Sequence, residues 1–298
     1  MSDTCGVPGC TPAVHAWHQP AGQHSLRLGP LRVTYVVDGV MRLSPHRFLP
    51  AVPAGHWRTH SYLLDSGGWL VMSTGGLLIQ HESGRSMLID TGFGPFRGDI
   101  GFGSVTCGAL PLALARTGLR PDAIDTVAFT HLHIDHVGWA FDEDRRPTFP
   151  RALYWVAANE LPHYQDGHIE TGAPSAARVI TPLARLAHRF GDGEEIFPGV
   201  TTWLTPGHSP GHTTYLVRHG EHRLVVFGDV LHSPTQLVHP AWGAAPDHDP
   251  AQAATTRDVV RARLHLPGTI GFGMHFADRP FGHLTDDAGP GVPWAPVT

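Results

Sequence analysis

Hydrophobic and polar residues alternate with a period of two along much of this chain, which is the pattern of β-strands that bury one face. The alternation begins at Leu26 and continues through a β-branched stretch to a predicted turn at Asp38-Gly39. Residues 75–94 predict a strand, a glycine turn and a second strand that ends at Asp90. Further strands are predicted at 123–130, 151–157, 200–218 (two strands around a loop), 222–229 and 269–276.

Helical patterns are fewer and lie between the strands. They are predicted at 109–118, 157–164, 175–190 and 250–265. Residues 44–68 contain several prolines and glycines and are typical of a loop. Strands in both halves, with helices between them, favour the α/β (α+β) class as a four-layer αββα sandwich, in which two sheets pack together and helices lie outside.

The first 25 residues differ from the rest of the chain. Residues 1–25 are rich in Gly, Pro and His without periodicity, so we interpret them as an N-terminal tail or arm, and residues 26–298 as one domain. A structural zinc bound within the arm is the alternative, but the cysteine spacing is looser than in a zinc knuckle. Its ligands would be Cys5, Cys10, His15 and His18.

Composition narrows the classes of function. The chain is 41% hydrophobic, which suits a packed core, and its net charge of −5 predicts neither nucleic acid nor an anionic membrane as a partner. All 21 basic residues are arginine, which excludes mechanisms that need a lysine. Only three cysteines and no signal-peptide pattern favour the cytoplasm. The most apolar stretch, 63–79, is interrupted by polar and glycine residues, so no membrane span is expected.

One run of residues has the spacing of metal ligands. His131, His133, Asp135 and His136 directly follow an apolar predicted strand. Alternate residues of an extended stretch point the same way, so His131, His133 and Asp135 share one face. Imidazole and carboxylate groups are ligands that zinc prefers. The alternative, a solvated polar loop, is disfavoured because this pattern is rare by chance.

Three later motifs could complete a metal site. His208 lies in a turn fixed by prolines and glycines, where a ligand has little conformational freedom left to lose. Asp229 ends an apolar strand, where a carboxylate could bridge two metals, and His275 lies in the last predicted strand. His212 is expected to be a hydrogen-bond partner or a structural residue rather than a ligand.

These motifs, in this order, resemble those of the metallo-β-lactamase superfamily over roughly residues 30–280. Asp90, in the run I-D-T-G, is similar to an early aspartate of that family that orients ligands. The branch that looks closest is that of the methyl parathion hydrolase-like enzymes and the N-acyl-homoserine-lactone lactonases. The runs T-P-G-H-S-P-G-H-T-T-Y-L-V and G-D-V-L-H-S-P-T-Q-L-V-H-P-A-W are similar to segments of the former.

The resemblance implies the chemistry of a binuclear site. Zinc is favoured for both divalent ions, although manganese, iron or cobalt would fit. A hydroxide between the metals would be the nucleophile, and Asp135 would also carry a proton to the leaving group. The implied ligands are His131, His133 and His208 for one ion, Asp135, His136 and His275 for the other, and Asp229 between them.

One position departs from the lactonase pattern. Lactonases of this branch carry a tyrosine three residues after the bridging aspartate, where it contacts the substrate carbonyl. This chain has His232 there, which can still donate a hydrogen bond. Phe93, Trp139 and Trp242 are candidate walls of a substrate pocket, with core packing as the alternative. Specificity is expected in the loops at 44–68, 93–108 and 232–249.

The sequence therefore predicts a binuclear-metal hydrolase of a small-molecule ester or lactone. Two alternatives keep the same metal site, namely an organophosphorus triester hydrolase and a biosynthetic thioesterase, cyclase or lyase. A non-catalytic metal-binding protein is least favoured, because the ligand set is complete. The arm and residues 44–68 could support a homodimer. The substrate, the metal and the oligomeric state are left open.

Overall fold

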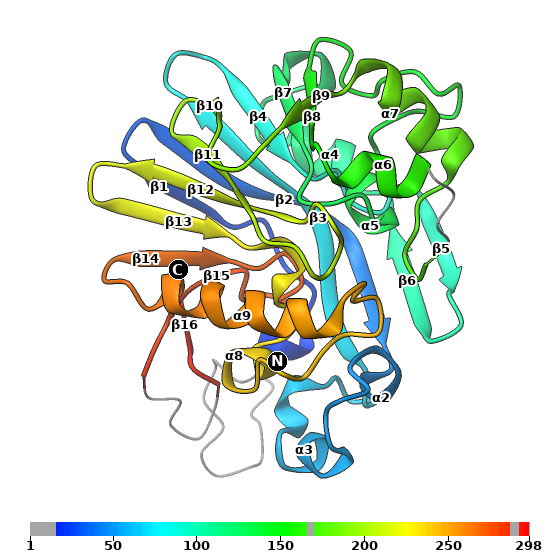
Figure 1. Cartoon of the computed structure of the whole chain (residues 1–298), viewed down its shortest axis with the longest axis vertical. Coiled ribbons are helices and arrows are strands. Elements are labelled where there is room, and N and C mark those ends of the chain that lie inside the picture. Colours follow the sequence, from blue (N-terminus) through cyan, green and yellow to red (C-terminus); the bar gives the residue numbers. More distant parts are fainter. Residues whose placement is uncertain (1–15, 166–169, 287–291, 298) are drawn as a thin grey trace, which may run out of the picture.

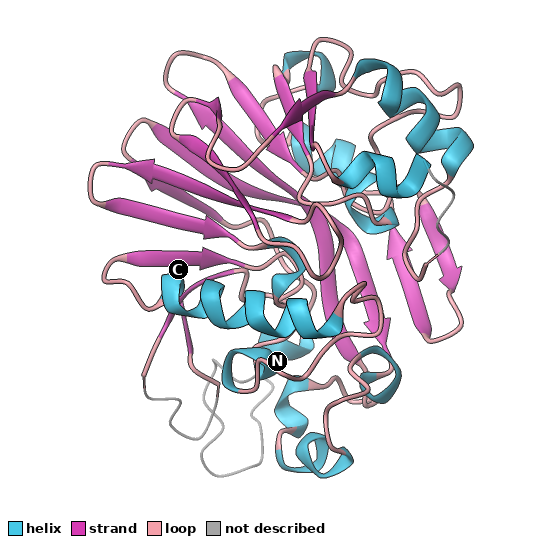
Figure 2. Cartoon of the chain, in the orientation of Figure 1, coloured by secondary structure: helices cyan, strands magenta, loops and turns pink. Residues whose placement is uncertain are grey.

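The computed structural model describes residues 16–165, 170–286 and 292–297, and it contains two β-sheets that pack face to face. Helices cover the outer face of each sheet (Figure 1, Figure 2). This arrangement confirms the predicted αββα layering.

The first sheet has nine strands in the order β5-β6-β2-β3-β4-β7-β8-β9, with β1 paired to β2. Pairing is parallel from β4 through β9 and antiparallel elsewhere in this sheet. The strands are β1 (Ser25–Leu28), β2 (Leu31–Leu43), β3 (Leu70–His81), β4 (Ser86–Ile89), β5 (Phe96–Asp99), β6 (Gly103–Cys107), β7 (Thr126–Ala128), β8 (Leu153–Ala157) and β9 (His188–Phe190).

The second sheet has seven strands that lie in sequence order from β10 to β16. Only the pair β13–β14 is parallel. The strands are β10 (Glu195–Phe197), β11 (Val200–Leu204), β12 (Thr213–His219), β13 (His222–Val226), β14 (Thr269–Phe272), β15 (Phe281–Leu284) and β16 (Trp294–Pro296).

Helices on the first sheet include α4 (Leu110–Ala115), α5 (Ile134–Val137), α6 (Glu160–Gln165) and α7 (Thr181–Leu186), with the π-helical turn η4 (Ala176–Ile180) before α7. The long α9 (Pro250–Leu264) packs against the second sheet (Figure 1). The shorter helices are η1 (Ala16–His18), α2 (Pro45–Phe48), α3 (Ala54–Thr59), η2 (Ser61–Leu63), η3 (Pro121–Ala123), η5 (Gly228–Val230) and α8 (Thr235–Val238). The described residues include no helix long and apolar enough to cross a membrane.

The alternation in the sequence decides which side chains face the interior. In β2, Tyr35 packs in the core between the two sheets, whereas Val36 packs under the helices. In β3, Leu77 and Leu78 divide in the same way. Successive side chains of a strand point to opposite faces, so both faces of the first sheet are apolar and buried.

The predicted turn at Asp38-Gly39 is wrong. The strand β2 runs through these residues with a register shift between Val37 and Gly39. Asp38 is buried, and its carboxylate accepts hydrogen bonds from four backbone N–H groups and from the indole of Trp139. The turn preference of Asp-Gly is local, and here long-range hydrogen bonds outweigh it.

Other predicted elements need correction as well. Residues 44–68 include short helices, residues 188–190 form a strand, and the hairpin of β5 and β6 was not predicted. The strand predicted at 269–276 ends at Phe272, so His275 lies in the loop that follows it, and two strands come later. Short elements stabilised by tertiary pairing carry little periodicity of their own.

The described part of the predicted arm packs against the body of the protein. Trp17 is buried, and Ala21 donates its backbone N–H to the hydroxyl of Ser73. The imidazole of His24 lies 2.6 Å from the carboxylate of Asp278. Residues 16–25 are therefore not a free tail. Cys5, Cys10 and His15, three of the four candidate ligands of an arm zinc, lie outside the described residues.

Candidate metal centre

The residues of the H-x-H-x-D-H run lie at the carboxyl end of β7. His131 and His133 follow the strand, and α5 carries Asp135 and His136. The three imidazoles are buried, while the side chain of Asp135 is 13% exposed. Gly138 ends this short helix, where a Cβ atom would lie 1.9 Å from the carbonyl carbon of Phe93. A glycine there lets the loop pack directly against the neighbouring backbone.

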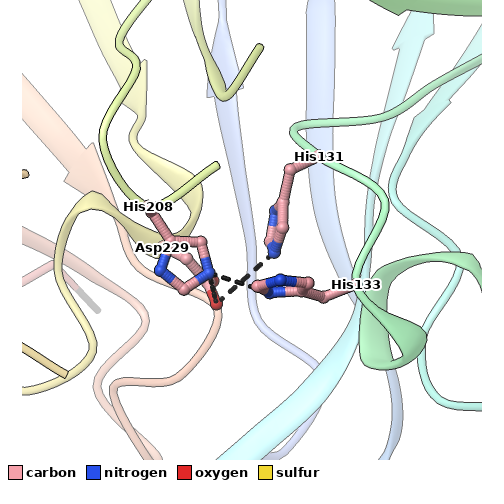
Figure 3. Close-up of side chains that lie close together, drawn as sticks. All are labelled: His131, His133, His208 and Asp229. Atoms are coloured by element: carbon pink, nitrogen blue, oxygen red, sulfur yellow. Dashed lines mark hydrogen bonds and ion pairs between the residues drawn. The ribbon is translucent and has the colours of Figure 1, made fainter. Parts of the chain in front are cut away.

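Three further candidate ligands come from the second sheet. His208 lies in the loop between β11 and β12, Asp229 follows β13, and His275 follows β14. All three side chains are buried. The edges of the two sheets therefore bring together residues that are far apart in the sequence, as Figure 3 shows for His131, His133, His208 and Asp229.

Asp229 lies between two groups of ligand atoms. Its Oδ2 is 3.4 Å from Nε2 of His208 and 3.8 Å from Nε2 of His131. Its Oδ1 is 3.3 Å from Nε2 of His136 and 3.1 Å from Nε2 of His275. The two oxygens of one carboxylate thus face different clusters, as a bridging ligand requires. The clusters are His131, His133, His208 and Asp229 on one side and Asp135, His136 and His275 on the other.

The ring orientation of each histidine in the two clusters is fixed by its second nitrogen. Nδ1 of His136 donates to Asp90, and Nδ1 of His275 donates to the carbonyl oxygen of Ser73. Such contacts hold one tautomer and turn the other nitrogen toward the centre, where Nε2 of His208 and Nδ1 of His133 lie 3.0 Å apart. The remaining contacts are His131 Nδ1 with Thr130 Oγ1, His133 Nε2 with Glu170 Oε1 and His208 Nδ1 with Asp247 Oδ1.

Burial controls the protonation of the first cluster. Burial lowers the pKa of His131 well below its usual value, and it lowers the pKa of His208 to about 4 although Asp247 and Asp229 oppose it. Both rings are therefore neutral at pH 7, which is the form that binds a metal. Burial raises the pKa of Asp229, but nearby histidines such as His136 outweigh this and hold it well below its usual value.

The buried polar atoms at the centre fit a bound cation. Nε2 of His131, His136 and His275 and Oδ1 of Asp229 make no hydrogen bond to any described residue, although all four are buried. An unsatisfied buried polar atom costs about 1–3 kcal/mol. Divalent metal ions would satisfy all of these atoms, and imidazole with carboxylate is a ligand set that suits zinc.

Asp90 and His212 make hydrogen bonds to residues of the two clusters. The carboxylate of Asp90 accepts hydrogen bonds from the backbone and the hydroxyl of Thr130, in addition to His136. Nε2 of His212 accepts the backbone N–H of Asp229, and its Nδ1 contacts the hydroxyl of Thr205. Both residues therefore contact candidate ligands, Asp90 through His136 and His212 through Asp229.

His232 lies beside Asp229. Its Nε2 is 3.2 Å from Oδ2 of Asp229, and its ring packs edge-on against Phe48. The side chain is buried, and neither ring nitrogen makes a hydrogen bond to a described residue. The ring is therefore placed against the carboxylate rather than in a cavity wall.

A cavity of about 260 Å³ opens onto the cluster. Its walls include residues from each of the three loops in which specificity was expected, such as Phe48, Ile100 and Pro246. Of the predicted pocket residues, Phe93 lines this cavity. Its apolar wall includes Met41, Leu43, Phe48, Met72, Phe93, Ile100 and Phe102, and its polar end consists of His133, Asp135, Asp229 and His275 with Thr171.

Trp139 and Trp242 are not among the residues that line the cavity, which corrects that prediction. The indole of Trp139 donates to the buried carboxylate of Asp38. The ring of Trp242 stacks on His239 at 3.8 Å and contacts His56. Both tryptophans therefore make structural contacts, which agrees with core packing, the alternative to a pocket wall given for them in the sequence analysis.

Two buried acids support the site and were not identified from the sequence. Glu160 accepts hydrogen bonds from the backbone N–H groups of Leu132 and Gly211 and from the hydroxyl of Ser209. It therefore links the H-x-H-x-D-H run to the loop that carries His208. Asp247 accepts from His208 and pairs with Arg257, which is fully buried. Neither acid lies in a recognisable sequence motif. What distinguishes them from other acidic residues is their burial, which the structure shows and the sequence does not.

Replacing Glu160 by alanine should weaken metal binding. The change removes the acceptor shared by two ligand loops, and we expect metal affinity to fall about 10- to 100-fold, as for other groups that orient ligands. Competition with a chromogenic chelator measures the affinity. Glu221→Ala is the matched control, because that side chain is 98% exposed. Equal affinity in the Glu160 variant and the wild type would show that this acid does not position the ligands.

Comparison with known proteins gives a consistent result. The sequence model of the Metallo-beta-lactamase superfamily matches residues 76–275. A hydroxyacylglutathione hydrolase of Neisseria meningitidis is 36% identical over 104 residues, which cover 35% of this chain and 33% of the relative. An N-acyl homoserine lactonase of Bacillus cereus is 29% identical over 114 residues, or 38% and 40% of the two chains. The matches thus span well under half of each curated relative.

Solved structures match over nearly the whole chain. The dizinc quorum-quenching lactonase AidC superposes with a TM-score of 0.80 at 22% identity, covering 94% of this chain and 99% of that one. The hydrolase AbOPH superposes with a TM-score of 0.78 at 25% identity and the same coverage. At such identities the likeness to AidC establishes the fold alone.

Proposed function

This chain belongs to the metallo-beta-lactamase superfamily, and from that premise we propose that it hydrolyses an ester or lactone of a small molecule with two divalent metal ions, zinc by preference. The observation that carries the proposal is the convergence of seven buried or nearly buried ligand side chains at the polar end of an apolar cavity. Seven ligands with one carboxylate between two clusters suit two metals rather than one.

The candidate ligands at the centre would have separate roles. His131, His133 and His208 would hold one ion, Asp135, His136 and His275 the other, and Asp229 both. When bound, the metals would lower the pKa of a coordinated water and polarise the oxygen of the bond under attack. Asp135 lines the cavity and is 13% exposed, so its carboxylate can accept a proton and pass it to the leaving group.

We assign His232 a different role from that expected. Since its ring lies against Asp229 and Phe48 and does not line the cavity, it acts as a positioning residue for the carboxylate of Asp229, not as a donor to the substrate carbonyl. Its replacement should therefore change kcat more than KM. A variant with unchanged kcat and raised KM would favour direct contact with the substrate.

The cavity favours an apolar acyl or aryl substrate. Apolar side chains form most of the wall that leads to the candidate metal ligands. Among the described residues that line the cavity there is no arginine, so the carboxylates of a glutathione thioester would find no cationic partner among them. An uncharged phosphotriester would fit the same wall and remains the second candidate. The predicted homodimer and cytoplasmic location stay predictions.

Metal analysis with a substrate panel tests the proposal. We expect about two metal ions per chain, and turnover of lactones or aryl esters above that of a glutathione thioester and a paraoxon-like triester. Preferred turnover of the triester would establish the second candidate instead. A protein that binds no stoichiometric metal after purification without chelator would contradict the proposal.

Narrowing the cavity should shorten the acyl chain that is accepted. Ile100 is partly buried in the cavity wall, and Ile100→Trp would occupy the space for about two methylene groups. We expect KM for a long-chain ester to rise about tenfold, since each buried methylene contributes about 0.8 kcal/mol. KM for an acetyl ester should not change. Steady-state kinetics on an ester series measures this, with Leu112→Trp, at a position 67% exposed, as control.

A further inference from the structure

A third cluster of histidine and carboxylate side chains lies beside the metal centre. It consists of His163 in α6, Glu170 in the following loop and His248 just before α9. Each offers one ligand atom, and these atoms all lie within 4.8 Å of one another. We propose that these three residues bind a third divalent cation, of the transition-metal type that imidazole prefers, separate from the two at the centre.

The two oxygens of Glu170 serve different neighbours. Oε1 accepts the hydroxyl of Tyr164 at 2.8 Å and lies 3.4 Å from Nε2 of His133. Oε2 faces outward, 3.3 Å from Nε2 of His163 and 3.4 Å from Nδ1 of His248. The outer oxygen can therefore bind a cation while the inner one continues to hold the ligand histidine.

The geometry of the cluster favours a bound cation over a plain hydrogen bond. Two imidazole nitrogens from separate segments face one carboxylate oxygen, and the two rings lie edge to face with centroids 4.8 Å apart. Two imidazoles with one carboxylate form a three-residue zinc ligand set.

The cluster also has room and access. It lines a cavity of about 310 Å³, which leaves space for water to complete the coordination. The side chain of His248 is 42% exposed, whereas His163 and Glu170 are 8% and 17% exposed. A cation can therefore enter from solvent on the His248 side and bind to two preformed ligands.

Binding there would brace the wall of the substrate cavity. Thr171 and Pro246, next to the proposed ligands, line both this cavity and the apolar one. The backbone N–H of His248 donates to the carbonyl oxygen of His208, and Glu170 contacts His133. A cation would thus link the loop after α6 to the loop before α9, one on each side of the first metal cluster.

Zinc stoichiometry in matched variants tests this inference. Equilibrium dialysis of the full-length protein against zinc chloride alone, followed by elemental analysis, should give about one equivalent more for the wild type than for His248→Ala. His222→Ala, which removes an exposed histidine from the β12–β13 hairpin, should bind as much as the wild type. Because the test compares the zinc content of the wild type with that of the variants, its result does not depend on how many ions the metal centre binds.

Zinc-edge anomalous diffraction from zinc-soaked crystals provides a second measurement that needs no variant. A peak among His163, Glu170 and His248 is expected, and it should be absent in His248→Ala crystals. Equal zinc content in the wild type and His248→Ala would overturn the proposal. So would zinc-soaked crystals with no anomalous peak at this cluster.

Discussion

Replacing Asp229 by asparagine should lower kcat/KM by at least about 10³-fold and reduce the bound metal. The amide keeps the shape of the side chain but removes the charge that faces both clusters. In the wild type, the carboxylate oxygens of Asp229 lie 3.1–3.8 Å from ring nitrogens of both clusters, namely those of His131, His136, His208 and His275. No other described residue can therefore take the place of Asp229 between the two clusters. Metal analysis and steady-state kinetics on the preferred substrate measure the two effects.

The control for this change is Asp122→Asn, which alters an exposed carboxylate paired only with Arg120. It should leave both metal content and kcat/KM unchanged. Circular dichroism and thermal melting of both variants separate loss of chemistry from loss of fold. If Asp229→Asn kept two metals and activity within tenfold of the wild type, the bridging role would be refuted.

Replacing Arg257 by methionine should cost the folded state about 3–5 kcal/mol, because it leaves the carboxylate of Asp247 buried without its cation. Arg257 is 0% exposed, and it also donates to the carbonyl oxygens of Val230 and Pro240. Burial raises the pKa of Asp247, but the hydrogen bond from His208 and the charge of Arg257 outweigh it and lower the pKa. Urea denaturation of the metal-free proteins measures the free energy of unfolding.

A double-mutant cycle separates the ion pair from simple loss of packing. Arg257→Met combined with Asp247→Asn should be destabilised by less than the sum of the two single changes, since neither charge is then left alone. Arg261→Met, on the same helix but 26% exposed, should change the stability by less than about 1 kcal/mol. Additive single and double changes would contradict a coupled pair.

The sequence identified the residues that the structure brings together at the candidate metal centre more completely than it identified the residues around them. The spacing of His131 and His133 predicts a shared face, but Asp135, which was expected to continue that face in an extended stretch, lies in the helix α5. Asp229 was identified because it ends an apolar predicted strand. His275 was identified although its predicted strand ends three residues earlier, at Phe272. An error of a few residues in a strand boundary does not matter when the motif order carries the inference.

Predictions that rested on local preference were less secure. Asp38-Gly39 has the composition of a turn, yet five long-range hydrogen bonds hold Asp38 inside a continuous strand. Trp139 and Trp242 are large and aromatic, as pocket walls often are, but both have partners elsewhere. Residue type alone cannot distinguish a cavity wall from the core, because both bury apolar surface.

The sequence by itself determined the layered fold and the set of candidate ligands, because strand periodicity and the candidate ligand motifs are encoded within short segments. Only the tertiary structure decided the support of that set by Glu160, Asp247 and Glu170, since each contacts residues more than 25 positions away. It also decided the shape of the apolar cavity, whose wall combines side chains from β2, β3 and the β5–β6 hairpin. Burial and pairing across such distances arise only when the two sheets pack together, so no local pattern in the sequence specifies them.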